Sequence, residues 1–482
     1  MSKKQSTSVI GSLIWKFLER GGVQITQFVV SIVIARLVAP EAYGSIALLT
    51  VFVSIATVFV QSGLSTALVQ KKDAKSVDYS SVFYYSLAVA LVVYGILFFS
   101  SGLIANFYEM PELKLVLRVM ALTLFPGALN SLQIAILTKK MQFKMQFYSS
   151  MIAIILSGSL GILMAYCNMG VWALVAQQLS YQVIVCIVLF YLMKWRPTLE
   201  FSYKRTKSLL EYGIKLLGAR LIDTIYHNLE SLIIGKKYSS EALAFCNKGK
   251  QFPLTLIDNL DGSIQSVMIS AYSKEQDDLD KIHSMLRRTM SMTTYIVFPA
   301  MVGLAVVGEP LIQLVLGEAW LGSIPFLQLY CFIAMLFPFQ TANLQAINAI
   351  GRSDVYLKLM TIKRIAGVVI LGASVFMFNS AISVVYACLV TEIFAIIVNI
   401  VPNTKLLNYS FFEQLGDIFP NLFISLIMGI VVWGVRLLKI SSLLMLAIQA
   451  LLGVVVYIVL SYISKNKSFG YIINNLKNKP QK

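Results

Sequence analysis

The chain has 482 residues, of which 57% are hydrophobic and only 13% are charged, whereas soluble domains are about 45–50% apolar and about a quarter charged. This composition excludes an ordinary soluble protein and indicates one that lies largely within a membrane. Forty Lys and Arg residues against 23 Asp and Glu give a formal net charge of +17. Such an excess is typical either of a nucleic-acid-binding surface or of cytoplasmic loops that orient a membrane protein.

The sequence predicts neither a metal site nor a catalytic centre. Its five cysteines are far apart in apolar surroundings, and it has just two histidines, His227 and His283, so no spacing typical of zinc or redox sites occurs. It contains no catalytic triad, Walker loop or nucleotide-binding fingerprint. We therefore expect no enzyme activity, no metal and no cofactor. The first apolar segment is too long for a cleavable signal peptide, and we expect it to remain as an uncleaved insertion signal.

Fourteen segments are apolar over about 20 residues, the length of helix that crosses about 30 Å of hydrocarbon. Their approximate limits are 9–37, 43–70, 80–105, 113–138, 147–167, 170–193, 208–235, 241–272, 289–307, 323–349, 357–378, 380–402, 418–437 and 442–464. All should be α-helices, since Gly and Pro fall mainly between them and no alternating pattern typical of a barrel is present. The prediction is an all-α polytopic membrane protein of about 14 transmembrane helices.

The distribution of basic residues predicts the orientation of these helices. With a cytoplasmic amino terminus, 25 of the 40 Lys and Arg residues fall in inner segments and only five in outer loops. This bias stays in phase through all fourteen spans, which supports the span count and places both termini in the cytoplasm. The other ten basic residues lie inside predicted spans: Lys16, Arg20, Arg36, Arg118, Lys215, Arg220, Lys248, Lys250, Lys363 and Arg364.

Charges inside predicted spans are candidates for function. A charge in hydrocarbon costs a few kcal/mol or more, so it normally faces a bundle interior or a wet cavity. Near a span end, a long side chain can instead reach the interface, and we expect this of Arg36, Lys363 and Arg364. Arg118 lies one to two turns from an outer end, and for it both interpretations stay open.

Lys16, Glu19 and Arg20 project to one side of the first span. Because neighbouring residues on a helix diverge, a contact between Glu19 and Arg20 is not expected, and a role in a cavity is favoured.

The seventh and eighth spans each carry a polar face. At about 100° per residue, five ionisable groups of the seventh fall within about 140° of arc: Lys215, Arg220, Asp223, His227 and Glu230. Polar residues of the eighth fall within about 100°: Asn247, Lys250, Gln251, Asp258, Asp261 and Gln265. Amphipathic helices at the membrane surface would show the same pattern, but the phase of the charged loops favours crossings. Pro253 should kink the eighth helix.

A weak internal repeat relates the two halves. A shift of 200 residues aligns seven identities, among them Arg20 with Arg220 and Glu41 with Glu241. Parallel six-helix halves with the substrate between them are a recurrent transporter design. We therefore predict two pseudo-symmetric lobes around a central cavity, residues 1–200 and 201–405, followed by two additional helices and a basic tail in 406–482. Arg20 and Arg220 would then face one another.

Several motifs resemble those of the polysaccharide transporter family. Residues 35–44, Ala-Arg-Leu-Val-Ala-Pro-Glu-Ala-Tyr-Gly, resemble its A-R-x-L-x-P-x-x-Y-G signature, and residues 61–64, 317–320 and 348–352 show further similarity. The family includes Wzx-like flippases of lipid-linked oligosaccharides and belongs to the multidrug/oligosaccharidyl-lipid/polysaccharide exporter superfamily. The fourteen-helix form is similar to the colanic-acid-exporter-like branch. These motifs are chiefly architectural, and Arg36, Pro40, Glu41 and Gly44 are interpreted as turn and packing residues.

The resemblance implies transport of undecaprenyl-pyrophosphate-linked oligosaccharide units, for O-antigen, capsule or exopolysaccharide, across the bacterial cytoplasmic membrane by alternating access. Cationic side chains would bind the pyrophosphate: Lys16, Arg20, Arg118, Lys215, Arg220 and Lys250. Polar side chains would bind the glycan: His227, Asn228, Asn247, Gln251 and Gln265. Carboxylates are candidates for coupling to H⁺ or Na⁺: Glu19, Asp223, Glu230, Asp258, Asp261 and Glu392. Expected partners are the lipid-linked substrate, membrane lipids, and a polymerase and glycosyltransferases, with the protein itself a monomer.

Three other classes of protein were weighed. A drug/cation antiporter of the same superfamily would favour an acidic cavity, whereas the charges in these helices are mostly basic. A membrane-embedded glycan polymerase or ligase usually has a large outer loop, and no outer loop here exceeds about fifteen residues, the length of a simple connection. A nucleic-acid-binding protein is not favoured, because the basic loops are short and separated by spans.

Overall fold

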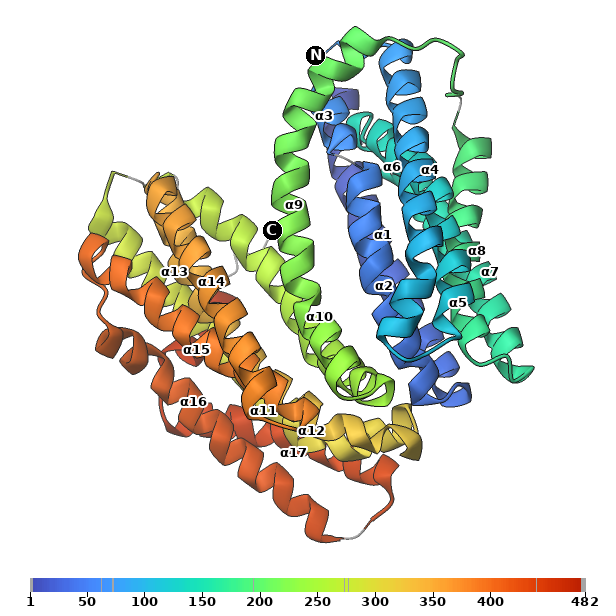
Figure 1. The fold of residues 1–482 in the computed structure, drawn as a ribbon. Helices are drawn as coiled ribbons and strands as arrows, with labels where there is room; N and C mark the ends of the chain where they lie inside the picture. Colours follow the sequence, from blue (N-terminus) through green and yellow to red (C-terminus); the bar gives the residue numbers. More distant parts are fainter. Residues whose placement is uncertain are drawn as a thin grey trace. The chain divides into compact units, whose positions relative to one another are not determined.

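The described part of the chain is almost entirely α-helical and contains no β-strand (Figure 1). The structure, a computed structural model, describes residues 3–61, 63–71, 73–193, 195–272, 274, 275, 277–438 and 440–477. The chain divides into two compact units, Met1–Ala244 and Phe245–Lys482, which are described separately below.

The first unit contains the helices as far as α9 and the start of α10. They are α1 (Lys3–Leu37), α2 (Pro40–Gln61), α3 (Leu64–Gln70), α4 (Ser76–Phe107), α5 (Leu113–Met120), η1 (Ala121–Thr123), α6 (Leu124–Lys139), α7 (Phe143–Tyr166), α8 (Val171–Leu192), α9 (Tyr203–Lys237) and α10 (Ser240–Tyr272). Helix α7 packs against α1 and α8, and α6 packs against α2, α4 and α8. One apolar core joins α3, α4, α6 and α8 around Leu68, Val82, Ile136 and Leu189.

The second unit contains the remainder of α10 and all later helices. These are α11 (Leu279–Val315), η2 (Glu318–Ser323), α12 (Ile324–Met335), α13 (Phe337–Ala349), α14 (Ser353–Met377), α15 (Ala381–Leu406), α16 (Phe411–Gly434), η3 (Val435–Leu438), α17 (Ser442–Ile463) and α18 (Lys467–Lys477). Helix α11 is central, because it contacts α12, α13, α16 and α17.

Eleven helical stretches among the described residues are long and apolar enough to cross a membrane. They cover the second to sixth and the ninth to fourteenth predicted spans. In the first span the described apolar stretch is shorter, Gly21–Leu37, and charged side chains lower the mean hydropathy of α9 and α10. Helix covers all three of these segments as well, so a multi-pass helical protein is confirmed, whereas the count of fourteen crossings stays a prediction.

Helix α9 packs against α2, α3 and α4 within the first unit, and glycines allow the close approach. A Cβ atom on Gly44, at the start of α2, would overlap the backbone of Ser240. At Gly63, where φ is +66°, a Cβ would lie 2.7 Å from the carbonyl oxygen of Gly213 in α9. Glycine is needed where backbones meet this closely or where φ is positive. Gly44 therefore has the packing role that its motif predicts.

A buried carboxylate fixes the start of α9 on α4. The Asp78 side chain is fully buried, and its Oδ1 and Oδ2 accept from Lys71 Nζ at 2.9 Å and Arg205 Nη1 at 3.1 Å. Beside it, Ser80 Oγ accepts from the backbone N–H of Thr198 at 2.9 Å. The connection from α8 to α9 is thus held on α4, and two basic residues that the sequence assigns to orientation also stabilise the fold.

In the second unit, polar contacts join α11 to α16 near their first turns and to η3, which follows α16, near their far ends. Towards their first turns, Arg287 donates to both carboxylate oxygens of Asp417, at 2.8 and 2.7 Å, and Asn421 donates to a backbone carbonyl of α11 at 2.8 Å. Towards their far ends, Arg436 pairs with Glu309. Bidentate Arg–carboxylate pairs have a fixed geometry, so the relative position of these two helices is well defined.

Replacing Gly44 with Ala should destabilise the protein. The added methyl group would overlap the backbone of Ser240, which cannot rotate away as a side chain can, and such overpacking costs about 1–3 kcal/mol. Thermal unfolding in detergent should therefore show a lower midpoint. Gly95→Ala is the matched control, because a Cβ at that position has no neighbour within 4 Å and the midpoint should not fall. Equal midpoints for both variants and the wild type would contradict the packing role of Gly44.

Candidate functional site

The charged residues predicted on the seventh span form an exposed face of α9. Lys215, Arg220, Asp223 and His227 are all exposed, whereas Glu230 is half-buried. The Asp223 and His227 side chains, 56% and 65% exposed, place Oδ1 and Nε2 3.6 Å apart. The structure therefore leaves four of the five ionisable groups accessible on a helix whose other side packs against α2, α3 and α4.

Within the described part of the chain, no ion pair neutralises the charges of the two cations on this face, Lys215 and Arg220. Arg220 donates from Nη2 to the neutral hydroxyl of Thr66 at 3.3 Å, and Lys215 forms no ion pair within the described part of the chain. Exposing either cation to hydrocarbon would cost a few kcal/mol. This face of α9 must therefore border water or polar groups and not lipid tails.

On α1, Lys16 has a partner of its own. Its Nζ lies 2.8 Å from Glu19 Oε2, and Gln146 of α7 donates to Glu19 Oε1 at 3.3 Å. The Glu19 side chain is 14% exposed and that of Lys16 is 40% exposed, so the carboxylate is enclosed and compensates the charge of a partly exposed lysine. Lys16 is consequently less available to a substrate anion than Lys215. The Arg20 side chain lies outside the described residues, as does its predicted relation to Arg220.

Arg118, for which two interpretations were open, contacts α4. Its Nε donates to Ser101 Oγ at 2.9 Å and to the carbonyl oxygen of Phe98 at 3.3 Å. The guanidinium lies over the Phe98 ring, 3.9 Å from the centroid. These contacts satisfy one nitrogen of the guanidinium and join α5 to α4, which is a structural role.

Helix α10 contains a buried cation that sequence reasoning did not select. Lys248 is 7% exposed, donates to Gln251 Oε1 at 3.3 Å, and lies 5.9 Å from the Trp320 ring centroid. Trp320 belongs to the Gly317–Trp320 motif, so this motif covers a lysine. The sequence already indicated the contact between Lys248 and Gln251, because the two residues are one helical turn apart and therefore lie on the same side of the helix.

The other predicted residues have varied surroundings. Asn228 donates to the carbonyl oxygen of Thr224 on its own helix at 2.8 Å, which occupies part of its amide. Asp258 is exposed, and three further α10 residues are half-buried: Asn247, Lys250 and Gln265. The Asp261 side chain lies outside the described residues.

Glu392 belongs to a charged cluster of the second unit. It accepts a hydrogen bond from Gln340 of α13 and interacts electrostatically with Lys363 and Arg364 of α14. Lys363 is only 8% exposed, so the prediction that it reaches the interface is wrong. Its amine is drawn inwards because an enclosed carboxylate on the next helix requires a countercharge. The sequence already indicated that Lys363 has a partner, because the next predicted span contains a carboxylate, Glu392.

Comparisons with known proteins agree with this fold. The family model described as "Polysaccharide biosynthesis protein" matches residues 33–325, more than half of the chain. The chain is 25% identical over 398 residues to the teichuronic acid biosynthesis protein TuaB of Bacillus subtilis, covering 79% of this chain and 80% of that protein. It is 22% identical over 306 residues to the lipopolysaccharide biosynthesis protein WzxC of Escherichia coli, covering 63% and 62%.

Solved structures show the same fold. The lipid II flippase MurJ in an inward closed conformation matches with a TM-score of 0.74 at 18% identity, covering 94% of this chain and 98% of that one. An inward-facing multidrug resistance transporter of the MATE family matches with a TM-score of 0.60 at 16% identity, covering 79% and 94%. Family match, fold and membrane helices lead to one conclusion: the chain belongs to the polysaccharide biosynthesis protein family and is a membrane transport protein rather than an enzyme.

Proposed function

We propose that the protein is a flippase that moves undecaprenyl-pyrophosphate-linked oligosaccharide units across the bacterial cytoplasmic membrane by alternating access. The units would supply O-antigen, capsule or exopolysaccharide. The names of the relatives, which refer to teichuronic acid and lipopolysaccharide biosynthesis, support this class of cargo. The observation that carries the proposal is the exposed pair of cations, Lys215 and Arg220, on a helix between two apolar halves of the sequence.

A pyrophosphate is the part of such a substrate that most needs the protein. It carries concentrated negative charge through a region where anions are as costly as cations. Arg220 can offer forked donors to phosphate oxygens, and Lys215 can act as a point charge. Sugar hydroxyls would bind polar side chains such as His227 and Gln251, while the prenyl chain needs only lipid. Each part of the substrate thus has a matching environment.

The accessibility of Lys215 favours an anionic cargo over a cationic drug, although the fold is shared with MATE transporters. Glu19 is already paired with Lys16, and Glu392 lies beside two cations. These carboxylates would have to leave their partners to bind a cationic drug, whereas Lys215 is available to an anion without any such loss.

Coupling to an ion is proposed for Glu392. Its carboxylate is the acidic member of an enclosed cluster on three helices, so gain of a proton or sodium ion would change the balance with Lys363 and Arg364. A change of about one charge in a low-dielectric setting alters helix packing energies by several kcal/mol. This is enough to shift a two-state equilibrium.

We also propose that both termini lie in the cytoplasm, as the basic loops predict, and that the protein acts as a monomer. A polymerase and glycosyltransferases would be its functional partners. The turn between α7 and α8 would then lie on the outer side.

Replacing Lys215 and Arg220 together with Gln should lower transport of lipid-linked units into inverted vesicles by about tenfold or more. Two hydrogen bonds to a charged group are lost, each contributing about 1.5–3 kcal/mol. Lys207→Gln is the control, because this exposed lysine lies on the same helix but before the predicted span. Unchanged transport in the double variant, at normal protein levels, would rule out this anion site.

Replacing Glu392 with Gln should remove the dependence of transport on an imposed pH or sodium gradient. The amide keeps the size of the side chain but cannot take up a proton or hold a cation. The rate would be measured in vesicles with and without each gradient, and Glu318→Gln, on an exposed residue of η2, should respond like the wild type. A Glu392→Gln protein that still responds fully would exclude this residue as the coupling group.

The orientation can be tested with a native cysteine. Cys167, at the turn between α7 and α8, is exposed, whereas the other four cysteines are buried or half-buried. A membrane-impermeant maleimide should label Cys167 from the outside of cells with an intact cytoplasmic membrane, and Cys167→Ser should abolish the label. Labelling that appears only after permeabilisation would reverse the proposed topology.

A further inference from the structure

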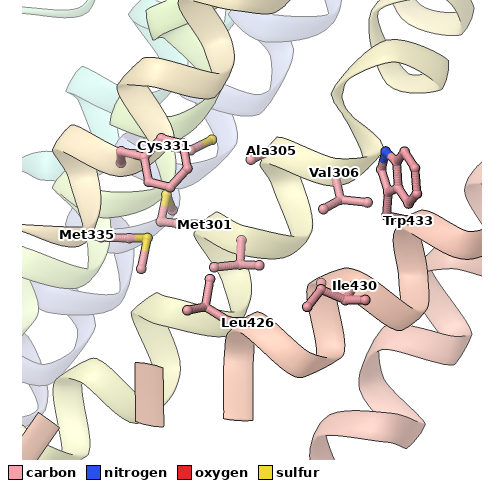
Figure 2. A pocket seen from close by; sticks show the side chains of 11 residues that line it. Met301, Ala305, Val306, Cys331, Met335, Leu426, Ile430 and Trp433 are labelled. Carbon is pink, nitrogen blue, oxygen red and sulfur yellow. The ribbon is translucent and has the colours of Figure 1, made fainter. Parts of the chain in front are cut away.

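An apolar pocket of about 260 Å³ opens between α11, α12 and α16 of the second unit (Figure 2). Met301 and Ala305 of α11, Cys331 and Met335 of α12, and Leu426 and Trp433 of α16 are among the residues that line it. The pocket is separate from the charged face of α9, which belongs to the first unit. At about 30 Å³ for a group the size of water, its volume holds on the order of eight such groups.

The helices around the pocket cannot close it by moving together. The ion pair Arg287–Asp417 joins α11 to α16, and the ion pair Arg436–Glu309 joins α11 to η3, which follows α16 directly. Between them the helices already touch, because a Cβ on Gly429 would lie 2.6 Å from Val302 Cγ1. The pocket is therefore a stable hollow left by small side chains such as Ala305, and not a gap that side-chain relaxation would fill.

The rim of the pocket is exposed and apolar, as expected of a surface that meets the bilayer. Ile430, Trp433 and Phe332 are 69%, 52% and 47% exposed, and all three lie in stretches apolar and long enough to cross the membrane. A water molecule needs two to four polar partners, which this lining does not offer. An empty hollow would forfeit the dispersion contacts of its walls, so hydrocarbon from the bilayer is the physically favoured filling.

The shape of the pocket suits a single unbranched chain. From Leu426 to Trp433 the wall runs along two turns of α16, about 10 Å at 1.5 Å per residue. Among the described residues, the cation just beyond this end is Arg436, which is paired with Glu309 and is therefore not available to a diphosphate headgroup. These observations favour an ordinary phospholipid over the lipid-linked substrate.

We propose that the pocket holds one acyl chain of a bilayer phospholipid, which completes the packing of α16 against α11 and α12. Because lipid chains are as apolar as the pocket walls, the hydrophobic effect contributes little to this binding. The chain is held by contact with the walls, and it exchanges with the bilayer through the open rim.

The test uses the full-length protein in vesicles that contain a phospholipid with a photoreactive diazirine on one acyl chain. After illumination and proteolysis, mass spectrometry should find adducts concentrated on the pocket-lining stretches of α11, α12 and α16. Ala305→Phe, which fills the pocket, should lower these adducts at least fivefold. Val454→Phe, on the exposed surface of α17 where Val454 is 61% exposed, should leave them unchanged.

Two results would overturn the proposal. One is an even spread of adducts over all lipid-exposed helices, with no effect of Ala305→Phe. The other is displacement of the pocket adducts by undecaprenyl phosphate but not by excess unlabelled phospholipid, which would assign the pocket to a prenyl chain. The competition arm uses the wild-type protein, so it decides the question even if Ala305→Phe fails to fold.

Discussion

The cost of a charge in hydrocarbon is the constraint on which this structure depends. Helix α9 carries Lys215, Arg220, Asp223 and His227 on one exposed face, and each would cost a few kcal/mol or more against lipid. The helix must therefore be held with its apolar side against protein and its charged side towards water or substrate. The close approach of Gly63 to Gly213 and the ion pair of Arg205 with the buried carboxylate of Asp78 hold α9 within the first unit, and Gly44 allows the close approach of Ser240, just after α9.

In the second unit, charged groups avoid the same cost because they pair with one another. Arg287 with Asp417, and Glu392 with its neighbouring cations, satisfy their charges within the helix bundle. The bidentate geometry of Arg287 with Asp417 and the burial of Lys363 beside Glu392 define how the helices are placed. Between the polar contacts of α11 with α16 and η3 lies the apolar pocket, lined by apolar side chains of α11, α12 and α16.

Sequence reasoning succeeded where a pattern reflects one helix and its surroundings. The apolar stretches located eleven helices that can cross a membrane, and the spacing of Lys215, Arg220, Asp223 and His227 located a charged face that the structure exposes. It failed where a side chain is paired with another helix. Lys363 was expected at the interface but is buried beside Glu392, because the position of α15 next to α14 is a property of packing and not of either segment.

The sequence by itself determined the class of protein, its helical membrane architecture and its family, because insertion into a bilayer is governed by the local apolar content of each segment. Only the tertiary structure decided which cations keep their charge available. Lys16 is paired with Glu19, whose carboxylate also accepts from Gln146 of another helix, and Arg118 is bound to α4, whereas Lys215 remains open to an anion. Charge pairing depends on distances of a few ångströms between helices far apart in the chain, and these distances arise from packing.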